Sequence, residues 1–309
     1  MKFELTVLGC GSAVPTSVRN SAAQVLNVLE RHFLIDCAEA TQLQLRRFHI
    51  PYTKINHIFI SHLHGDHFLG LFGLLSTLSL QNRKGEIHLY ADERLKKILD
   101  FQFGIMNMKL SYTLVFHALS RKQELLYEDD LLTVESFPLK HRYDAPASGF
   151  LFREKERLRT IRRDMVDAWE VPIAFMQNIK RGEDFVTKDG RVVANRQLTL
   201  PAPAPRSYAY MSDTVYREEF AEYVRGVDLL YHEATYGRGF AHLAKETFHS
   251  TAEQAAMLAK KADVGKLLLG HFSSRYPTSE LLLDEAIAIF SNTFVCHDGD
   301  VFDVPYKKI

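Results

Sequence analysis

The feature that most constrains this chain is a dense group of metal-ligand side chains directly after an apolar stretch. Four of them fall within six residues: His62, His64, Asp66 and His67. Residues 55–60, just before them, have the pattern of a buried strand, and Gly65 favours a turn. Imidazole and carboxylate groups suit a divalent cation such as zinc or manganese. The pattern therefore predicts a metal site on a loop at the end of a strand.

Length and composition favour a soluble protein with a large core. The chain has 309 residues, 46% of them hydrophobic, which allows one large domain or two small ones. Its 38 basic and 38 acidic residues neither require nor exclude a polyanionic partner. Cys10, Cys37 and Cys296 are too few and too far apart for a disulfide framework. Residues 1–8 do not resemble a signal peptide and the apolar run 68–80 is too short for a bilayer, so we expect a cytoplasmic protein.

Further polar residues each follow a short apolar strand pattern. These residues are His62, His141, Asp213, Glu233 and His271. Several strand ends thus point toward one edge of a layered α/β domain, where loops carry function over a rigid scaffold. Taken one at a time, His141 and His271 are as readily structural histidines as ligands.

The number of candidate ligands favours two cations. A catalytic zinc needs about three protein ligands and a water. The sequence offers seven candidates: His62, His64, Asp66, His67, His141, Asp213 and His271. Two cations about 3.5–4 Å apart stabilise both the attacking and the leaving oxygen in phosphodiester hydrolysis. Asp213 is the natural bridge, because it has two oxygens and follows a strand alone.

Other periodicities predict the framework around these residues. Helical spacing is expected over 41–49, 68–80, 94–103 and 218–225. A hairpin is expected from residues 22–29 and 32–36. Ser250 and Glu253 fit a capping box, which would open a helix that runs through about Ala262.

Residues 153–206 differ from the rest of the chain. The segment begins with a cation-rich run at 153–163, loses clear periodicity after residue 171, and ends in the proline-rich stretch 201–205. Alternating prolines suit an extended, semi-rigid stalk. We interpret 153–206 as a flexible insertion that projects from the main domain. An ordinary surface subdomain with a solvated charged helix is the alternative.

These motifs resemble the metallo-β-lactamase superfamily and, within it, the ribonuclease Z family of tRNA 3′-processing endonucleases. The superfamily is indicated by residues 62–67 alone. The narrower resemblance is carried by residues 8–16, 19–20, 36–42, 138–141, 212–214, 232–235, 249–251 and 271–276. It implies a four-layer αββα sandwich that forms a single domain over 1–309. Residues 153–206 would be the projecting exosite arm that binds tRNA.

The resemblance also implies a role for each site residue. One zinc ion would be held by His62, His64 and His141, the other by Asp66, His67 and His271, with Asp213 as the bridge. Asp66 would also act as general base. His249, held by Glu233, would protonate the leaving ribose 3′-oxygen. Without the resemblance, the alternative is a helix-capping histidine and a buried structural glutamate. Substrate contacts are expected from Thr16, Arg19, Ser273, Arg275, Lys180 and Arg181.

The expected function is a zinc-dependent endoribonuclease that removes the 3′ trailer from precursor tRNA and leaves a 3′-hydroxyl on the tRNA. Two zinc ions per subunit are expected, although the same ligands accept manganese or cobalt. A homodimer without membrane association is also implied. The alternatives are another hydrolase of this fold, acting on a small phosphodiester or a lactone, and a metal-stabilised RNA-binding protein without catalysis. The chain has Ala38 and Ala40 where the family usually has glycine, which predicts local crowding.

Overall fold

A computed structural model describes residues 2–307, and these residues form two compact units. The first unit takes in the described parts of Met1–Tyr127, Val134–Phe152 and Ser207–Val304. The second unit takes in the described parts of Glu128–Thr133, Arg153–Arg206 and Pro305–Ile309.

One seven-stranded sheet has the strand order β18-β1-β2-β3-β4-β5-β6. Its strands are β1 (Phe3–Gly9), β2 (Ala23–Val28), β3 (Arg31–Ile35), β4 (Ile55–Phe59), β5 (Glu86–Ala91), β6 (Thr113–Ala118) and β18 (Val301–Asp303). The β2–β3 hairpin turns at Leu29 and Glu30, which both have positive φ, as a two-residue turn between twisted strands requires. From β3 to β6 the strands are parallel, so the ends of β4, β5 and β6 lie at one edge.

A second seven-stranded sheet has the order β17-β16-β15-β14-β9-β8-β7. Its strands are β7 (Glu124–Glu128), β8 (Leu132–Pro138), β9 (Ser148–Glu154), β14 (Ser207–Met211), β15 (Leu229–Glu233), β16 (Leu267–Gly270) and β17 (Thr293–Val295). The strands β14 to β17 are parallel, which again collects their carboxyl ends at one edge.

Aromatic side chains fill the space between the two sheets. The ring of Phe59 in β4 lies 5.3 Å from that of Phe150 and 5.5 Å from that of Phe152, both in β9. Phe33 in β3 packs 5.4 Å from Phe152. Such large buried rings bring much apolar area and fix the distance between the sheets. Polar contacts also cross this layer, because the Tyr210 hydroxyl donates to Asp36.

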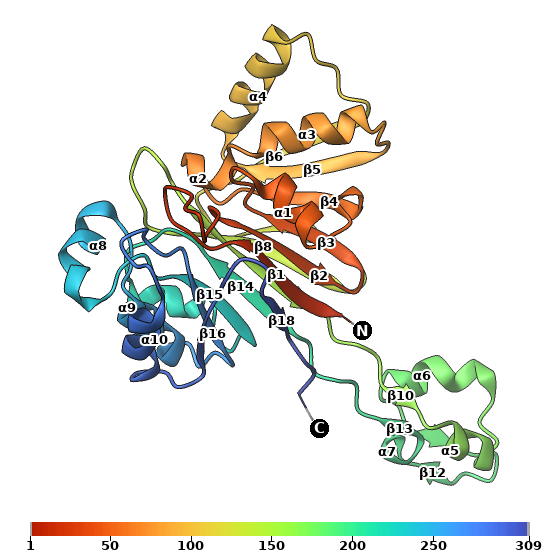
Figure 1. Cartoon of the computed structure of the whole chain (residues 1–309). Coiled ribbons are helices and arrows are strands. Elements are labelled where there is room, and N and C mark those ends of the chain that lie inside the picture. Colours follow the sequence, from red (N-terminus) through yellow and green to blue (C-terminus); the bar gives the residue numbers. More distant parts are fainter. Residues whose placement is uncertain (1, 308–309) are drawn as a thin grey trace. The chain divides into compact units, whose positions relative to one another are not determined.

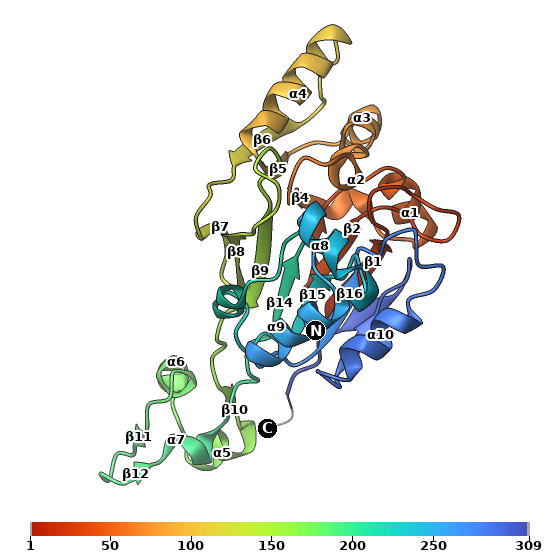
Figure 2. The ribbon, with the colours of Figure 1, turned by 90° about the vertical axis from the view of Figure 1, so that its left-hand side faces the viewer.

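Helices cover the outer face of each sheet, which gives the first unit four layers (Figures 1 and 2). The first sheet carries α1 (Thr41–Arg47), η1 (Tyr52–Lys54), α2 (Gly65–Phe68), α3 (Leu71–Leu80) and α4 (Glu93–Ile105). The second carries η3 (Glu218–Glu222), η4 (Arg238–Phe240), α8 (Ala241–Thr247), α9 (Ala252–Lys261) and α10 (Glu280–Ile287). The αββα architecture expected from the sequence is therefore the one that forms.

The second unit consists of short elements around a small apolar core. They are β10 (Thr160–Ile161), α5 (Arg163–Ala168), η2 (Ile173–Phe175), α6 (Met176–Lys180), β11 (Phe185–Val186), β12 (Val192–Val193), α7 (Asn195–Leu198) and β13 (Thr199–Leu200). The core residues are Val166, Val171, Ile179, Phe185, Val193 and Leu198. At its base Glu154 accepts two hydrogen bonds from the Arg206 guanidinium, at 2.8 and 3.0 Å. Much of the segment in which the sequence loses periodicity is thus folded.

Three local predictions were wrong in instructive ways. The helix expected over 68–80 is split into α2 and α3, because the Gly70 N–H donates to the Cys37 carbonyl at 3.0 Å and not within a helix. Glycine is required there, since a Cβ would lie 1.9 Å from the Ala38 oxygen. The expected helix over 218–225 is only the 3₁₀ turn η3. The capping box is formed one residue later than predicted, by Thr251 and Gln254.

Ala40 has a backbone conformation that favours glycine. It caps the start of α1 with φ of 66° and ψ of −2°, in the left-handed region. A Cβ is disfavoured there because it approaches the following carbonyl oxygen. The described part of the chain contains no helix with the length and hydropathy needed to cross a membrane.

Candidate active site

Seven side chains from both sheets meet at the edge where the parallel strands end, and we call them the strand-end cluster. They are His62, His64, Asp66, His67, His141, Asp213 and His271. The first four lie on the loop and short helix after β4. His141, Asp213 and His271 follow β8, β14 and β16. All seven are the residues that the sequence singles out as metal ligands.

Within the cluster, one group consists of His62, His64, His141 and Asp213. Nε2 of His62 lies 3.0 Å from Nδ1 of His64, and Nε2 of His141 lies 3.2 Å from the same atom. The three ring nitrogens therefore lie close enough together to bind one cation. Asp213 contributes its Oδ2, which lies 3.4 Å from Nε2 of His62.

The other group consists of Asp66, His67 and His271. Nε2 of His67 lies 3.2 Å from Nε2 of His271 and 3.6 Å from Oδ2 of Asp66. Oδ1 of Asp213 lies 3.2 Å from Nε2 of His271. Asp213 therefore presents one oxygen to each group, the arrangement expected of a bridging carboxylate.

The ring nitrogens that point away from the cluster are held by neighbouring groups. His141 donates from Nδ1 to the Phe248 carbonyl at 2.9 Å. Nδ1 of His67 lies 2.7 Å from Oδ2 of Asp36, and Nδ1 of His271 lies 3.0 Å from the Thr235 hydroxyl. Such contacts fix the ring orientation and leave Nε2 free to bind a cation.

The pKa shifts within one group favour the protonation states that a cation requires. Burial lowers the pKa of His62 to about 3, helped by the charge of His67, and burial also lowers the pKa of His64 and His141. Burial alone would raise the pKa of Asp213, but the charges of His271, His67 and His62 hold it well below its usual value. Neutral imidazoles beside an ionised carboxylate are ready to ligate.

The other group carries an excess of negative charge. Burial opposes protonation of His67, yet Asp213, Asp66 and Asp36 together raise its pKa well above the usual value. For Asp66, burial is likewise outweighed by the charge of His67 and the hydrogen bond from His271, which lower its pKa. Three carboxylates around one ring form a site whose charge a divalent cation would balance. The residues present therefore fit a divalent metal centre.

His249 and Glu233 form a pair beside the cluster. Nδ1 of His249 lies 3.0 Å from Oε1 of Glu233, and the backbone N–H groups of Thr214 and Ser250 donate to the same oxygen. Burial would lower the pKa of His249, but Glu233 and Asp213 raise it to about 9. The His249 side chain is 13% exposed while Glu233 is completely buried, so only the histidine is open to a ligand.

The loop after β1 lies against the cluster. The Ala13 N–H donates to Oδ2 of Asp66 at 2.6 Å. The Thr16 hydroxyl accepts from the N–H of Arg19 at 3.0 Å and closes a turn of this loop. The Arg19 guanidinium is buried and donates to the Tyr276 carbonyl at 2.7 Å, so it braces the loop from inside.

The other predicted substrate contacts lie in two places. Ser273 and Arg275 follow His271, and the Arg275 side chain is exposed. Lys180 ends α6 and Arg181 follows it, so both belong to the second unit. Their roles in substrate binding stay predictions.

Sequence reasoning missed Asp36 and Thr235 as supports of the site. Asp36 is completely buried and accepts from the Ser61 N–H and hydroxyl and from Tyr210, besides its contact with His67. Thr235 links Glu233, His249 and His271 through one hydroxyl. For Asp36 the signal was present, because it too is a carboxylate directly after an apolar strand.

Known proteins resemble this chain over nearly its full length. Ribonuclease Z of Bacteroides fragilis is 47% identical over 299 residues, which cover 96% of this chain and 98% of that protein. Ribonuclease Z of Phocaeicola vulgatus is 46% identical, with 96% of each chain covered. The chain belongs to the ribonuclease Z family. As a member, it is an endoribonuclease, a hydrolase of the metallo-β-lactamase fold.

Solved structures agree with this assignment. Human tRNase Z, short form, superposes with a TM-score of 0.72 at 28% identity and covers 98% of this chain and 99% of that one. The metallo-β-lactamase fold protein YhfI of Bacillus subtilis has a TM-score of 0.68 at 17% identity and covers 98% and 100%. At that identity the likeness shows the fold alone.

A family model described as anti-Pycsar protein Apyc1 matches residues 3–166. This region includes His62, His64 and His141 but ends before Asp213, Glu233, His249 and His271. The ribonuclease Z relatives cover those later residues as well, which is why the family assignment rests on them.

Proposed function

We propose that this ribonuclease Z family member is a zinc-dependent endonuclease that removes the 3′ trailer from precursor tRNA and leaves a 3′-hydroxyl on the tRNA. One observation carries the proposal: Asp213 presents an oxygen to each of two ligand groups, with the His249–Glu233 pair beside them. This combination supplies what phosphodiester hydrolysis needs, which is charge stabilisation at the phosphate and proton transfer on both sides of it.

Two zinc ions per subunit are the proposed cofactors, with manganese or cobalt as possible replacements. His62, His64 and His141 would hold one ion, and Asp66, His67 and His271 the other. When bound, the cations supply Lewis acidity, which polarises the phosphate and makes water more acidic. The support for two ions is the number of donors, since a single catalytic zinc takes about three protein ligands.

Asp66 is proposed to orient the attacking water and to accept its proton. One of its oxygens is held by the Ala13 N–H at 2.6 Å, which restricts the rotation of the carboxylate. The water oxygen then forms the new bond to phosphorus while the bond from phosphorus to the ribose 3′-oxygen breaks. The 5′-phosphate stays on the trailer.

His249 is proposed to donate the proton that the departing 3′-oxygen requires. Glu233 holds Nδ1 of its ring at 3.0 Å, so Nε2 is the nitrogen left for the substrate. The backbone N–H groups of Thr214 and Ser250 fix Glu233 in turn. A proton donor with a fixed orientation suits a poor leaving group such as an alkoxide.

Residues 153–206, the longest segment of the second unit, are proposed to bind the body of the tRNA away from the bond that is cut. Lys180 and Arg181 would contact phosphates there. A hollow in the same segment is lined by Trp169 and Phe175 and by the cations Lys188 and Arg191, of which Arg191 pairs with Asp189 at 3.0 Å. Basic and aromatic side chains together suit sequence-independent contacts with RNA.

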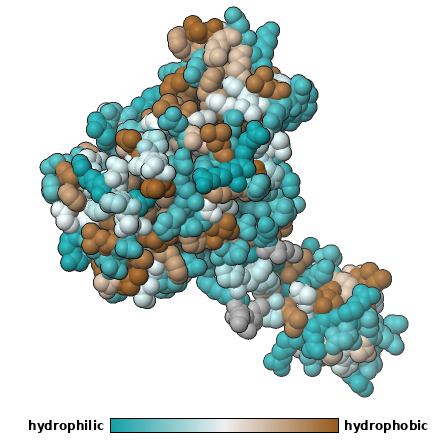
Figure 3. Space-filling model, viewed as in Figure 1, coloured by the Kyte–Doolittle hydropathy of each residue, from teal (hydrophilic) through white to brown (hydrophobic). Residues whose placement is uncertain are grey.

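A homodimer in the cytoplasm is the proposed form of the enzyme. On α4 the side chains of Ile98, Phe101 and Ile105 are exposed at helical spacing, and brown atoms gather at the top of Figure 3, where Figure 1 shows this helix. An apolar helix face of this kind fits a contact with a second copy. Replacement of Phe101 by Glu should leave a monomer in light scattering.

The experiment that tests the function is incubation with precursor tRNA, with and without a chelator, followed by mapping of the cut. The proposal expects a chelator-sensitive cut at the 3′ end of the tRNA that leaves a 3′-hydroxyl on the tRNA and a 5′-phosphate on the trailer. Hydrolysis of a small phosphodiester or a lactone, without any cut in the RNA, would favour the other hydrolases of this fold. Binding without any cut would favour a non-catalytic RNA-binding protein.

A further inference from the structure

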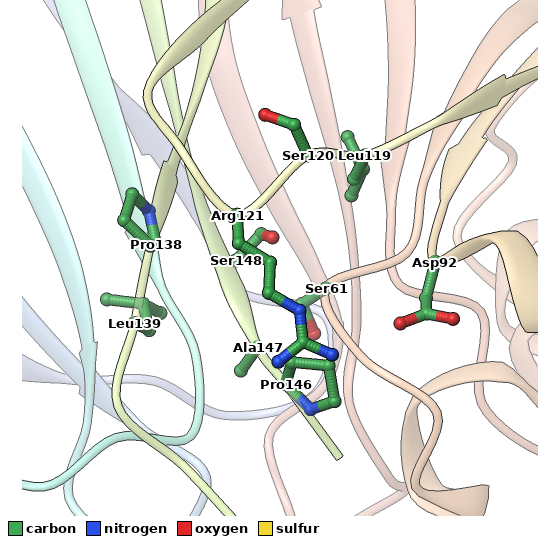
Figure 4. A pocket seen from close by; sticks show the side chains of 10 residues that line it. All are labelled: Ser61, Asp92, Leu119, Ser120, Arg121, Pro138, Leu139, Pro146, Ala147 and Ser148. Carbon is green, nitrogen blue, oxygen red and sulfur yellow. The ribbon is translucent and has the colours of Figure 1, made fainter. Parts of the chain in front are cut away.

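A small hollow adjoins the strand-end cluster on the side of β5, β6, β8 and β9. It is lined by residues from both sheets: Ser61, Asp92, Leu119, Ser120, Arg121, Pro138, Leu139, Pro146, Ala147 and Ser148. Ser61 directly precedes His62, and Leu139 lies two residues before His141. In Figure 4 the Arg121 side chain extends across the hollow, with its guanidinium between Ser61 and Pro146.

The Arg121 guanidinium lies in the hollow without a close partner among the described residues. Among residues 2–307, no hydrogen bond or ion pair engages its guanidinium, and only a longer-range attraction to Asp92 exists. Asp92 is itself occupied, because its oxygens accept from the N–H, Nε and Nη2 of Arg94 at 2.8–3.0 Å. The guanidinium therefore retains donors for a ligand, and a planar guanidinium matches a phosphate.

A hydroxyl faces the same hollow without a partner. No hydrogen bond within the described residues engages the side chain of Ser148, although its N–H donates to the Ser61 carbonyl at 2.9 Å. A guanidinium and a free hydroxyl thus face one hollow, whose lining also includes the Asp92 carboxylate that Arg94 already engages. Leu119, Leu139 and Pro146 add apolar walls, while Arg121 itself is exposed to solvent and to an incoming ligand.

The hollow and Glu233, which holds His249, lie on opposite sides of β14 in the strand order of the second sheet, while the His249 ring itself packs 5.1 Å from that of His141. In the second sheet, β15 carries Glu233, the partner of His249, on one side of β14, while β9 and β8 lie on the other. In the first sheet, β5 and β6 lie beyond β4, on the side away from β1. The proposed function puts the departing tRNA 3′-oxygen at His249. On the proposed function, the trailer keeps the phosphate and extends from there toward the hollow.

We infer that the Arg121 hollow binds a backbone phosphate of the trailer strand, downstream of the bond that is cut. This inference rests on the proposed function and deepens it, because it gives the enzyme a contact with the RNA that it discards. Arg121 is then a binding residue and takes no part in proton transfer. The contact orients the trailer side of the scissile phosphate.

The test compares two precursor tRNAs, one with a single-nucleotide trailer and one with a long single-stranded trailer. Only the long trailer has phosphates beyond the scissile one. Arg121→Ala should raise KM for the long trailer by about tenfold, the scale of a charge-assisted contact, and leave the short one within about twofold. The dependence of log KM on log salt for the long trailer should weaken by about 0.7, the value for one single-strand phosphate.

Two further variants are matched to this change. Lys122→Ala removes the neighbouring exposed cation, which does not line the hollow, and should leave KM for both precursors unchanged. Arg121→Lys keeps the charge but loses the planar guanidinium fork, so it should restore only part of the loss. Hydrolysis of a small nitrophenyl phosphodiester should be the same in all four proteins.

Equal losses on both precursors, or no loss on either, would overturn the inference. An effect of Arg121 that added inorganic phosphate abolishes, with no dependence on trailer length, would assign the hollow to a free anion and also overturn it. If the unaltered protein cuts neither precursor, the proposed function and the inference fail together. If it cuts both and Arg121→Ala behaves like the unaltered protein, only the inference fails.

Discussion

The strand-end cluster and the second unit differ in how their functional side chains are supported. The cluster is attached to the ends of strands in two seven-stranded sheets, and buried groups such as Asp36 hold its rings. The second unit is built from two-stranded sheets and helices of four to six residues around a small core. Chemistry needs atoms fixed within a fraction of an ångström, whereas phosphate contacts tolerate more variation.

The largest expected effect is the loss of hydrolysis when the strand-end cluster is altered and the second unit is left intact. Asp66→Ala removes a carboxylate from the cluster, so hydrolysis of both tRNA and a small diester should fall by about a thousandfold or more. Initial rates on both substrates check this, with circular dichroism to confirm folding. Asp100→Ala removes an exposed carboxylate on α4 and is the matched control. Full turnover by Asp66→Ala would rule out its proposed role.

His249→Ala should separate substrates by leaving group. Loss of the proton donor should slow cleavage of precursor tRNA by at least about a hundredfold. A nitrophenyl phosphodiester has a good leaving group and should lose only a few-fold. Rates on the two substrates, measured side by side, decide the matter. Equal losses would mean that His249 acts otherwise, for example as a ligand together with Asp213 and His271.

Leu198→Ala should destabilise the second unit and leave the strand-end cluster intact. Leu198 is fully buried in the core of the second unit, so its truncation should cost about 2–5 kcal/mol of the free energy of unfolding of that unit. Trp169, the single tryptophan of the chain, packs against this core, and its fluorescence reports on this unit. The denaturant midpoint should fall while hydrolysis of a small diester persists. Leu200→Ala, at a position 54% exposed, should change little.

Replacement of residues 157–203 by a short Gly-Ser linker tests whether the second unit serves binding alone. Loss of its phosphate contacts should raise KM for precursor tRNA by roughly tenfold to a hundredfold. The small diester should be hydrolysed as before. A charge-reversed variant, with Glu at both Lys180 and Arg181, should reproduce most of the loss without a deletion. If the deletion reduces both activities equally, the unit is not a separate binding element.

The smallest effect concerns Ala40, at the start of α1. Ala40→Gly should raise the free energy of unfolding by about 1 kcal/mol, because glycine adopts the left-handed conformation of this position without strain. Thermal denaturation measures the change. Ala256→Gly, in the interior of α9, should have the opposite sign and a similar size. A destabilised Ala40→Gly protein would mean that the methyl group contributes packing that outweighs its strain.

The same contrast explains what the sequence could and could not reveal. His62, His64, Asp66 and His67 are close in the chain and carry rare side-chain chemistry, so these four could be predicted along with the strand before them. His141 and His271 could be assigned only through the family resemblance. The partners of Asp36 and Thr235 could not be predicted, because these hydrogen bonds join residues far apart in the chain. In the second unit, two-residue strands such as β10 and β11 are too short to show a period. Gly70 split a predicted helix through a tertiary contact that no local pattern reports.

The central claim is that the strand-end cluster holds two cations with Asp213 between them. Elemental analysis of folded protein, purified without chelator and resupplied with zinc or manganese, measures this directly. The account predicts two tightly bound ions per chain, and fewer in a folded Asp213→Ala variant. A folded, resupplied protein that binds one ion or none would contradict it.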